Sequence, residues 1–330
     1  MGAAEAGAPV SLNSNEAIMD TLFIPLVIPL ALAAGALLAV QAGANAQLSR
    51  AIGSPFAATT LQLSVGAILL LLITLLSGTV LALSRLPHAQ WWHVIGGTAS
   101  AFYVISGILL FPRIGAVVSV GLFIAGQVLA STALDVFGLL GVTTTGLSPG
   151  VTGGAMLVMT GATLIVLGQN NASSEVGPAQ YAWIALALLA GAVLPVQGAV
   201  NALLKHDLGG ATFAVGAVSF IVAAITMAVT QIGVAAVPGA AKPNIDGLSS
   251  MPWWGWLGGF AGATYVTTVF TAIPVIGAAT TVGLTVAGQQ VASVFVDRYG
   301  WFRLPQRPVS TMRLIGVALL LAGVGVIKLL

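Results

Sequence analysis

The sequence predicts an all-α polytopic membrane protein with ten transmembrane helices, arranged as two inverted five-helix repeats. The 330 residues are 58% hydrophobic and 5% charged, with a mean hydropathy of +1.05, whereas soluble domains carry about a quarter charged residues. Nearly uncharged windows of about 18 or more residues recur, and this is the length that a spanning helix needs. The third observation is an internal repeat, which predicts how many helices there are and in which direction each half enters the membrane.

The repeat is clearest between residues 112–138 and 274–300. The second segment follows the first at an offset of 162 residues, and 22 of the 50 positions in 91–140 are identical to their counterparts. Shared hydrophobic composition alone does not produce identity at this level. The expected domains are an N-terminal tail at 1–21, a first repeat at 22–171, a linker at 172–180 and a second repeat at 181–330.

Ten apolar runs define the expected helices. Those of the first repeat are 22–48, 56–77, 92–111, 114–138 and 151–168. Those of the second are 181–204, 212–237, 253–273, 275–299 and 311–330. The tail has no Lys or Arg ahead of the first run, so we expect a short, disordered, mildly acidic segment rather than a cleaved signal.

Five helices per repeat is an odd number, so the second copy should enter the membrane in the opposite sense. The loop before the last helix carries Arg298, Arg303 and Arg307, while the equivalent loop at 139–151 carries no basic residue. The positive-inside rule places the basic loop in the cytoplasm. A count of all Lys and Arg, seven against three, then puts both termini outside.

A polar stripe runs along the helix at 114–138. Residues i, i+4 and i+8 share a helix face, and a polar face on a lipid-buried helix must meet protein or a water-filled cavity. We expect the glutamines to line the central cavity and bind substrate, because an amide offers donors and an acceptor without a charge. The alternative is that each amide only ties its helix to a neighbour. The stripe and its copy are Gln127, Ser131 and Asp135, and Gln289, Ser293 and Asp297.

A second polar pair recurs at an offset of 156 residues. Gln41 and Asn45 match Gln197 and Asn201, and residues four apart share one face. They are candidates for the same substrate-binding cavity, with hydrogen bonding between helices as the alternative.

Two tyrosines, Tyr103 and Tyr265, also match across the repeats. Binding a substrate hydroxyl and packing are equally open roles for them.

Asp135 and Asp297 are the only acids within these repeated helices. Ionisable residues inside membrane segments are functional candidates, here for proton coupling. Both lie in the last helical turn, so a capping contact or a salt bridge to a loop arginine explains them equally well.

Several functions are excluded. The chain has no cysteine, and its ten basic and eight acidic residues do not suggest nucleic acid. No Walker A motif precedes any lysine, and His88, His93 and His206 lack a metal-ligand spacing. We expect no metal, no cofactor and no enzyme activity.

Four motifs together are similar to those of the YdcZ family of the drug/metabolite transporter (DMT) superfamily. They are P-x-I-G-A, A-G-Q and D-x-F/Y-G in both repeats, and G-x5-Q-x3-N from Gly35 to Asn45. Members are typically single five-helix units, so the chain resembles two units fused. The resemblance implies a transporter, and ten-helix relatives usually keep both termini in the cytoplasm. This disagrees with the charge count, so the orientation stays open.

The leading hypothesis is a secondary transporter in the plasma (inner) membrane that exports small metabolites or amphipathic compounds. It would work as a monomer by alternating access, driven by a proton gradient or by the gradient of its small-molecule substrate. The alternative is a non-transporting membrane protein, such as a lipid-scrambling or scaffold component.

Overall fold

The computed structural model describes residues 14–114, 116–144, 146–167, 178–239, 242–304, 306 and 310–329, and these contain helices and loops but no strand. The first repeat has five long helices, α1 (Ser14–Ile52), α2 (Pro55–Leu76), α4 (Thr98–Ile114), α5 (Ala116–Phe137) and α6 (Pro149–Leu167). The second has α7 (Pro178–Asp207), α8 (Thr212–Ala235), α9 (Leu257–Ile276), α10 (Ala278–Tyr299) and α11 (Thr311–Leu329).

Short helices fill the connections. In the first repeat they are η1 (Val80–His88), α3 (Trp91–Val94), η2 (Ile95–Gly97) and η3 (Leu139–Gly141). In the second they are η4 (Asp246–Ser250), η5 (Trp253–Trp256) and η6 (Trp301–Arg303).

Ten apolar elements lie where the sequence predicted them, and the all-α polytopic membrane fold is confirmed. In the described part of the chain, eight helices are long and apolar enough to cross a membrane. The other two elements, in α6 and α11, are shorter apolar stretches at Pro149–Ile165 and Thr311–Ile327. Two boundaries differ from expectation: α1 begins within the expected tail and α7 within the expected linker. The remainder of both segments, 1–13 and 172–177, lies outside the described residues.

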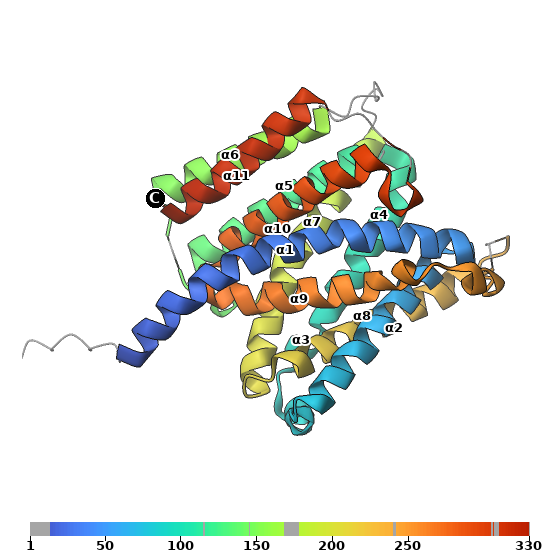
Figure 1. Ribbon diagram of the computed structural model, residues 1–330, viewed down its shortest axis with the longest axis horizontal. Coiled ribbons are helices and arrows are strands. Elements are labelled where there is room, and N and C mark those ends of the chain that lie inside the picture. Colours follow the sequence, from blue (N-terminus) through green and yellow to red (C-terminus); the bar gives the residue numbers. More distant parts are fainter. Residues whose placement is uncertain are drawn as a thin grey trace, which may run out of the picture.

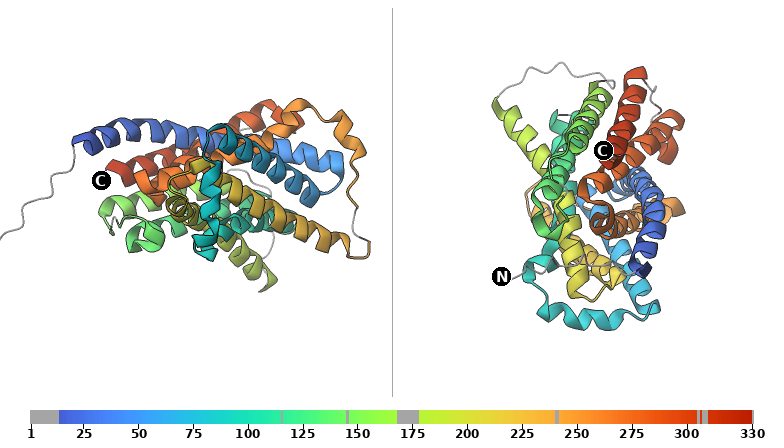
Figure 2. Two further views of the ribbon diagram at one scale, coloured as in Figure 1. Left: turned by 90° about the horizontal axis from the view of Figure 1, so that it is seen from below. Right: turned by 90° about the vertical axis from the view of Figure 1, so that its left-hand side faces the viewer.

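The two repeats are interlocked rather than set side by side. The first helix of each repeat packs on the third and fourth helices of the other, so α1 contacts α9 and α10 while α7 contacts α4 and α5. The remaining helices pair with their own counterparts, α2 with α8 and α6 with α11. Figure 1 shows α6 and α11 together along one edge, with α2 and α8 on the far side of the molecule, and Figure 2 shows the same arrangement from two other sides. Each half therefore completes the other's core.

Glycines let α1 and α10 touch backbone to backbone. A β-carbon on Gly35 would lie 2.0 Å from the Thr285 carbonyl oxygen, and one on Gly288 would lie 2.0 Å from that of Leu32. Real β-carbons do not approach so closely, so these positions require glycine. Small residues that allow close backbone approach are typical of helix contacts in membranes.

The equivalent residues make the same contact between α7 and α5. A β-carbon on Gly191 would lie 2.0 Å from the Phe123 carbonyl oxygen, and one on Gly126 would lie 2.0 Å from that of Leu188. The two crossings that join the repeats are therefore copies of one another.

Candidate functional site

The predicted substrate-binding residues lie on the helices that cross between the repeats. Gln41 and Asn45 are on α1, Gln197 and Asn201 on α7, Tyr103 on α4 and Tyr265 on α9. Gln127 and Ser131 are on α5, with Gln289 and Ser293 on α10. These helices bring most of the polar side chains into two related clusters.

The α7 cluster consists of Ser100, Gln197, Asn201 and Ser219, and its members are bonded to one another. The Ser100 hydroxyl on α4 donates to the Gln197 Oε1 atom at 2.9 Å. The Ser219 hydroxyl oxygen on α8 accepts from Gln197 Nε2 at 3.3 Å and from Asn201 Nδ2 at 3.1 Å. Gln197, Asn201 and Ser219 are all buried, so the cluster ties α4 of one repeat to α7 and α8 of the other.

The α1 cluster consists of Gln41, Asn45, Thr59 and Gln62, and most of its hydrogen-bonding capacity is unused. Asn45 Nδ2 donates to the Thr59 hydroxyl at 3.2 Å, but Asn45 Oδ1 has no partner and neither does Nε2 of the buried Gln62. Within the described residues, no hydrogen bond involves the half-buried Gln41. The cluster therefore offers free donors and an acceptor.

Both free amide nitrogens of the α1 cluster lie against glycines of α9. A β-carbon would come within 2.5 Å of Gln41 Nε2 if built on Gly262, and within 1.6 Å of Gln62 Nε2 if built on Gly258. Gly258 and Gly262 are one turn apart on the same helix face. The two amides thus rest on bare backbone instead of a polar side chain.

A sequence difference between the repeats explains why Gln197 is hydrogen-bonded and its counterpart Gln41 is not. Ser100 corresponds to Gly262 at the offset of 162, so the hydroxyl that holds Gln197 has no counterpart beside Gln41. Asn201 Oδ1 is unpaired like Asn45 Oδ1. A buried polar atom without a partner costs about 1–3 kcal/mol, and a bound solute or water would relieve that cost.

The two matched tyrosines lie on equivalent helices of the two repeats, Tyr103 on α4 and Tyr265 on α9. Tyr265 is buried and Tyr103 half-buried. The Tyr103 ring packs on Phe123, with the ring centroids 4.9 Å apart. Of the two roles left open by the sequence, the packing role thus has a contact at Tyr103.

Gln127 and Gln289 lie on α5 and α10, which pack against each other. Gln127 is buried and Gln289 is half-buried. No hydrogen bond to either amide is found within the described part of the chain. The serines one turn on bond within their own helices, Ser131 to the Val128 carbonyl and Ser293 to that of Gln290.

Asp135 caps a helix of the other repeat. Its two carboxylate oxygens accept hydrogen bonds from the backbone N–H groups of Ala278 at 2.7 Å and Ala279 at 2.6 Å. These are the first residues of α10, and the preceding Gly277 has φ +82°. A carboxylate at a helix N-terminus is stabilised by the helix dipole and by charge-assisted bonds.

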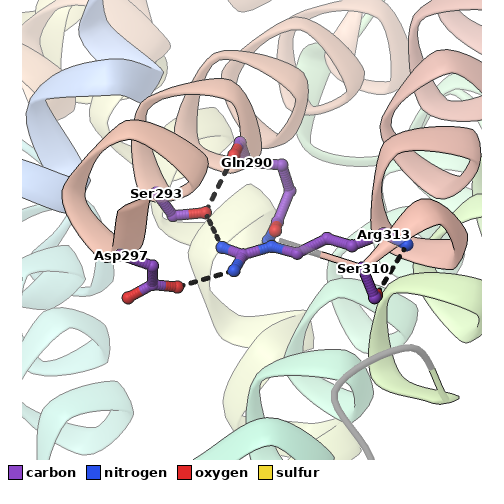
Figure 3. A network of polar contacts seen from close by, with 5 residues as sticks. All are labelled: Gln290, Ser293, Asp297, Ser310 and Arg313. Carbon is purple, nitrogen blue, oxygen red and sulfur yellow. Dashed lines mark hydrogen bonds and ion pairs between the residues drawn. The ribbon is translucent and has the colours of Figure 1, made fainter. Parts of the chain in front are cut away.

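Asp297, the counterpart of Asp135, is held by an arginine (Figure 3). Arg313 Nη1 donates to Asp297 at 2.6 Å, and Arg313 Nη2 donates to the Ser293 hydroxyl at 2.8 Å. Arg313 is buried, and its Nε atom has no partner. The sequence left a helix cap and a salt bridge open for these acids. The structure has the cap at Asp135 and the salt bridge at Asp297.

Sequence reasoning missed several residues of this site. Gln62 and Ser219 were not singled out, because the helices at 56–77 and 212–237 align only weakly. Ser100 lies in the clearly repeated segment, but its counterpart is Gly262, so recurrence did not mark it. The ion pair between His93 Nδ1 and Asp207 at 2.5 Å was also missed. It joins α3 to the end of α7 and is not repeated in sequence, so no pattern marked it. In the described part of the chain, no group of three or more His, Cys, Asp or Glu residues could hold a metal ion.

The fold is that of a multi-pass membrane protein built from two interlocked five-helix repeats. The family model described as "Putative inner membrane exporter, YdcZ" matches the chain twice, over residues 26–164 and 182–326. The chain therefore belongs to the YdcZ family, as two units fused in one polypeptide, and is a multi-pass protein of the inner membrane that acts on a small-molecule substrate.

Solved structures add support for the fold alone. In one crystal structure, a protein 19% identical in sequence superposes with a TM-score of 0.66, covering 92% of this chain and 96% of the other. In total, 16 chains of solved structures match. A search of the curated proteins finds no match.

Proposed function

We propose that this protein is a secondary exporter that moves a small polar or amphipathic metabolite by alternating access between its two repeats. The observation that carries the proposal is the pair of amide clusters between the repeats, one bonded and one with free donors and an acceptor. Equivalent clusters in an inverted repeat would present related binding groups to the two sides of the membrane in turn.

The cluster chemistry favours a neutral, hydrogen-bonding substrate group. Carboxamides, hydroxyls and phenols make up the lining, so a cargo with both donors and acceptors would be matched without burying an unpaired charge. Gln127 on α5 and Gln289 on α10 are further candidates for binding such a cargo.

The energy source we propose is a proton gradient or the substrate's own gradient. Asp135 and Asp297 are the candidate proton carriers, and in this structure both carboxylates are held by partners. Because each repeat completes the other's core, we further propose that the chain works as a monomer. An obligate dimer, found by mass measurement in nanodiscs, would contradict this.

The test begins with a metabolite-wide thermal-shift screen on the purified protein, since a ligand that binds the folded state raises its melting temperature. Uptake of a hit into proteoliposomes is then compared in the wild type, Gln127→Leu and Gln289→Leu, with Gln90→Leu on the exposed surface as the control. We expect lost transport with normal folding in the first two variants and no change in the control.

The alternative remains a non-transporting membrane protein, for example in lipid scrambling. A protein that moves fluorescent phospholipid between leaflets but takes up no screened solute would favour it. Normal transport in both glutamine variants would refute the assignment of the site while leaving the transporter itself intact.

A further inference from the structure

α5 and α10 form an antiparallel pair whose two ends are equivalent under the repeat. The end of α5, at Asp135, meets the start of α10, at Ala278, and the helices pack along each other, as Figure 1 shows. At the offset of 162, Asp297 corresponds to Asp135 and Ala116, the first residue of α5, corresponds to Ala278. Symmetry would therefore pair Asp297 with the start of α5.

The two ends are in different states. Asp135 is bonded through both oxygens to the start of α10 and is 3% exposed. Asp297 instead pairs with Arg313, and its side chain is 24% exposed. In the described residues, no hydrogen bond joins Asp297 to α5.

Burial along the pair follows the same division. At five pairs of counterparts, the side chain at the Asp135 end is buried and the one at the Asp297 end is only half-buried, whereas other pairs, such as Ile124 and Val286, are buried at both ends. The buried residues are Gln127, Ser131, Val282, Leu284 and Ala287, and their half-buried counterparts are Gln289, Ser293, Val120, Leu122 and Ala125. The helix pair is therefore tight at one end and looser at the other.

We propose that Asp135 and Asp297 are alternating latches, each closing one end of the α5–α10 pair by capping the first turn of the opposite helix. This inference rests on the proposed alternating-access function. In the opposite-facing state, Asp297 leaves Arg313 and caps Ala116 at the start of α5, while Asp135 releases α10. An inverted repeat reaches its second state when the halves exchange conformations, and the two equivalent acids have different partners here.

Arg313 gives the exchange a physical basis. A carboxylate released from a helix N-terminus inside a membrane needs a new partner, because an unpaired charge there is costly. Arg313 supplies that partner for Asp297, whereas its counterpart Val151 supplies none for Asp135. The described state, with Asp135 latched and Asp297 neutralised, is therefore the more stable of the two.

Cysteine reporters test the latch without a substrate, because the chain contains no natural cysteine. Val282→Cys reports the tight end and Val120→Cys the loose end, and the two positions are equivalent. Labelling by a water-soluble maleimide in nanodiscs gives the ratio of the Val120 rate to the Val282 rate. We expect a ratio well above one in the otherwise native chain.

Asp135→Asn should lower this ratio roughly tenfold, because it removes charge-assisted bonds from the tight end. Arg313→Gln should lower it too, by freeing Asp297 to cap α5. Adding Asp297→Asn to Arg313→Gln should return the ratio to the native value or above. Asp246→Asn, an exposed acid in η4, is the control for loss of a charge.

The proposal is overturned if Arg313→Gln leaves the ratio unchanged, or if Asp135→Asn speeds labelling at both ends alike, as a purely structural cap would. If the labelling ratio changes as expected but the protein transports no solute, the exporter is refuted and the latch is kept. If the protein transports a solute but the variants leave the labelling ratio unchanged, the latch is refuted and the exporter is kept.

Discussion

The glycine crossings between the repeats give the sharpest prediction for stability. A β-carbon at Gly35 would sit 2.0 Å from the Thr285 oxygen, whereas ordinary contact begins at 3.4 Å. In Gly35→Ala, α1 and α10 must therefore separate by more than 1 Å (3.4 − 2.0 = 1.4) along a contact in which Gly288 is equally tight. Overpacking of this kind costs about 1–3 kcal/mol.

The matched control is Gly153→Ala in α6, where a β-carbon would meet nothing within 4 Å. That change should stabilise the helix by about 0.5–1 kcal/mol, because alanine loses less backbone entropy than glycine. Detergent-induced unfolding, followed by the fluorescence of the seven tryptophans, measures both. Equal stability of Gly35→Ala and Gly153→Ala would refute the reasoning, and the same test applies to Gly191→Ala at the equivalent crossing.

Three further predictions follow from individual contacts. Asp207→Asn should lower stability by about 1–3 kcal/mol in the same unfolding assay, because buried His93 loses its charged partner, while Asp246→Asn should change it by less than about 0.5 kcal/mol. Gly262→Ser places a β-carbon 2.5 Å from Gln41 Nε2, at the end of a flexible side chain that can move aside. It should then give Gln41 the bond that Ser100 gives Gln197 and stabilise the protein by about 0.5–1.5 kcal/mol, whereas Ser100→Gly should destabilise it; a gain in both would contradict the pairing. In whole cells, an impermeant thiol reagent should label Thr144→Cys but not Gln306→Cys, since the basic loop belongs in the cytoplasm; the reverse result would reverse the orientation, and labelling of both would exclude an inverted repeat.

Much of the fold could be predicted from the sequence because a membrane limits the choices. A spanning segment must satisfy its backbone hydrogen bonds internally, so each long apolar run becomes a helix. The repeat then showed which helices of the two halves correspond to one another. What the sequence did not show is which repeat each helix packs against, because α1 and α7 carry the same small-residue pattern that either neighbour would accept.

The site was predictable only where the repeats agree. Gln41, Gln197 and the two aspartates were marked by recurrence, and the structure places all four on the helices that join the repeats. Recurrence could not show that Asp135 caps α10 while Asp297 pairs with Arg313, because both acids occupy equivalent positions. Their partners are decided by residues outside the repeated motif.

The differences between the repeats are therefore informative in their own right. Shared residues such as Gly35 and Gly191 build two copies of one crossing, and identical copies alone would favour a symmetric structure. Two substitutions break that symmetry at polar positions: Gly262 opposite Ser100, and Arg313 opposite Val151. The first leaves Gln41 without the hydroxyl that Ser100 gives Gln197, and the second gives Asp297 an arginine partner that Asp135 lacks. If the protein works by the proposed alternating access, such divergence between fused repeats would set the direction and selectivity of transport, while their common residues maintain the fold.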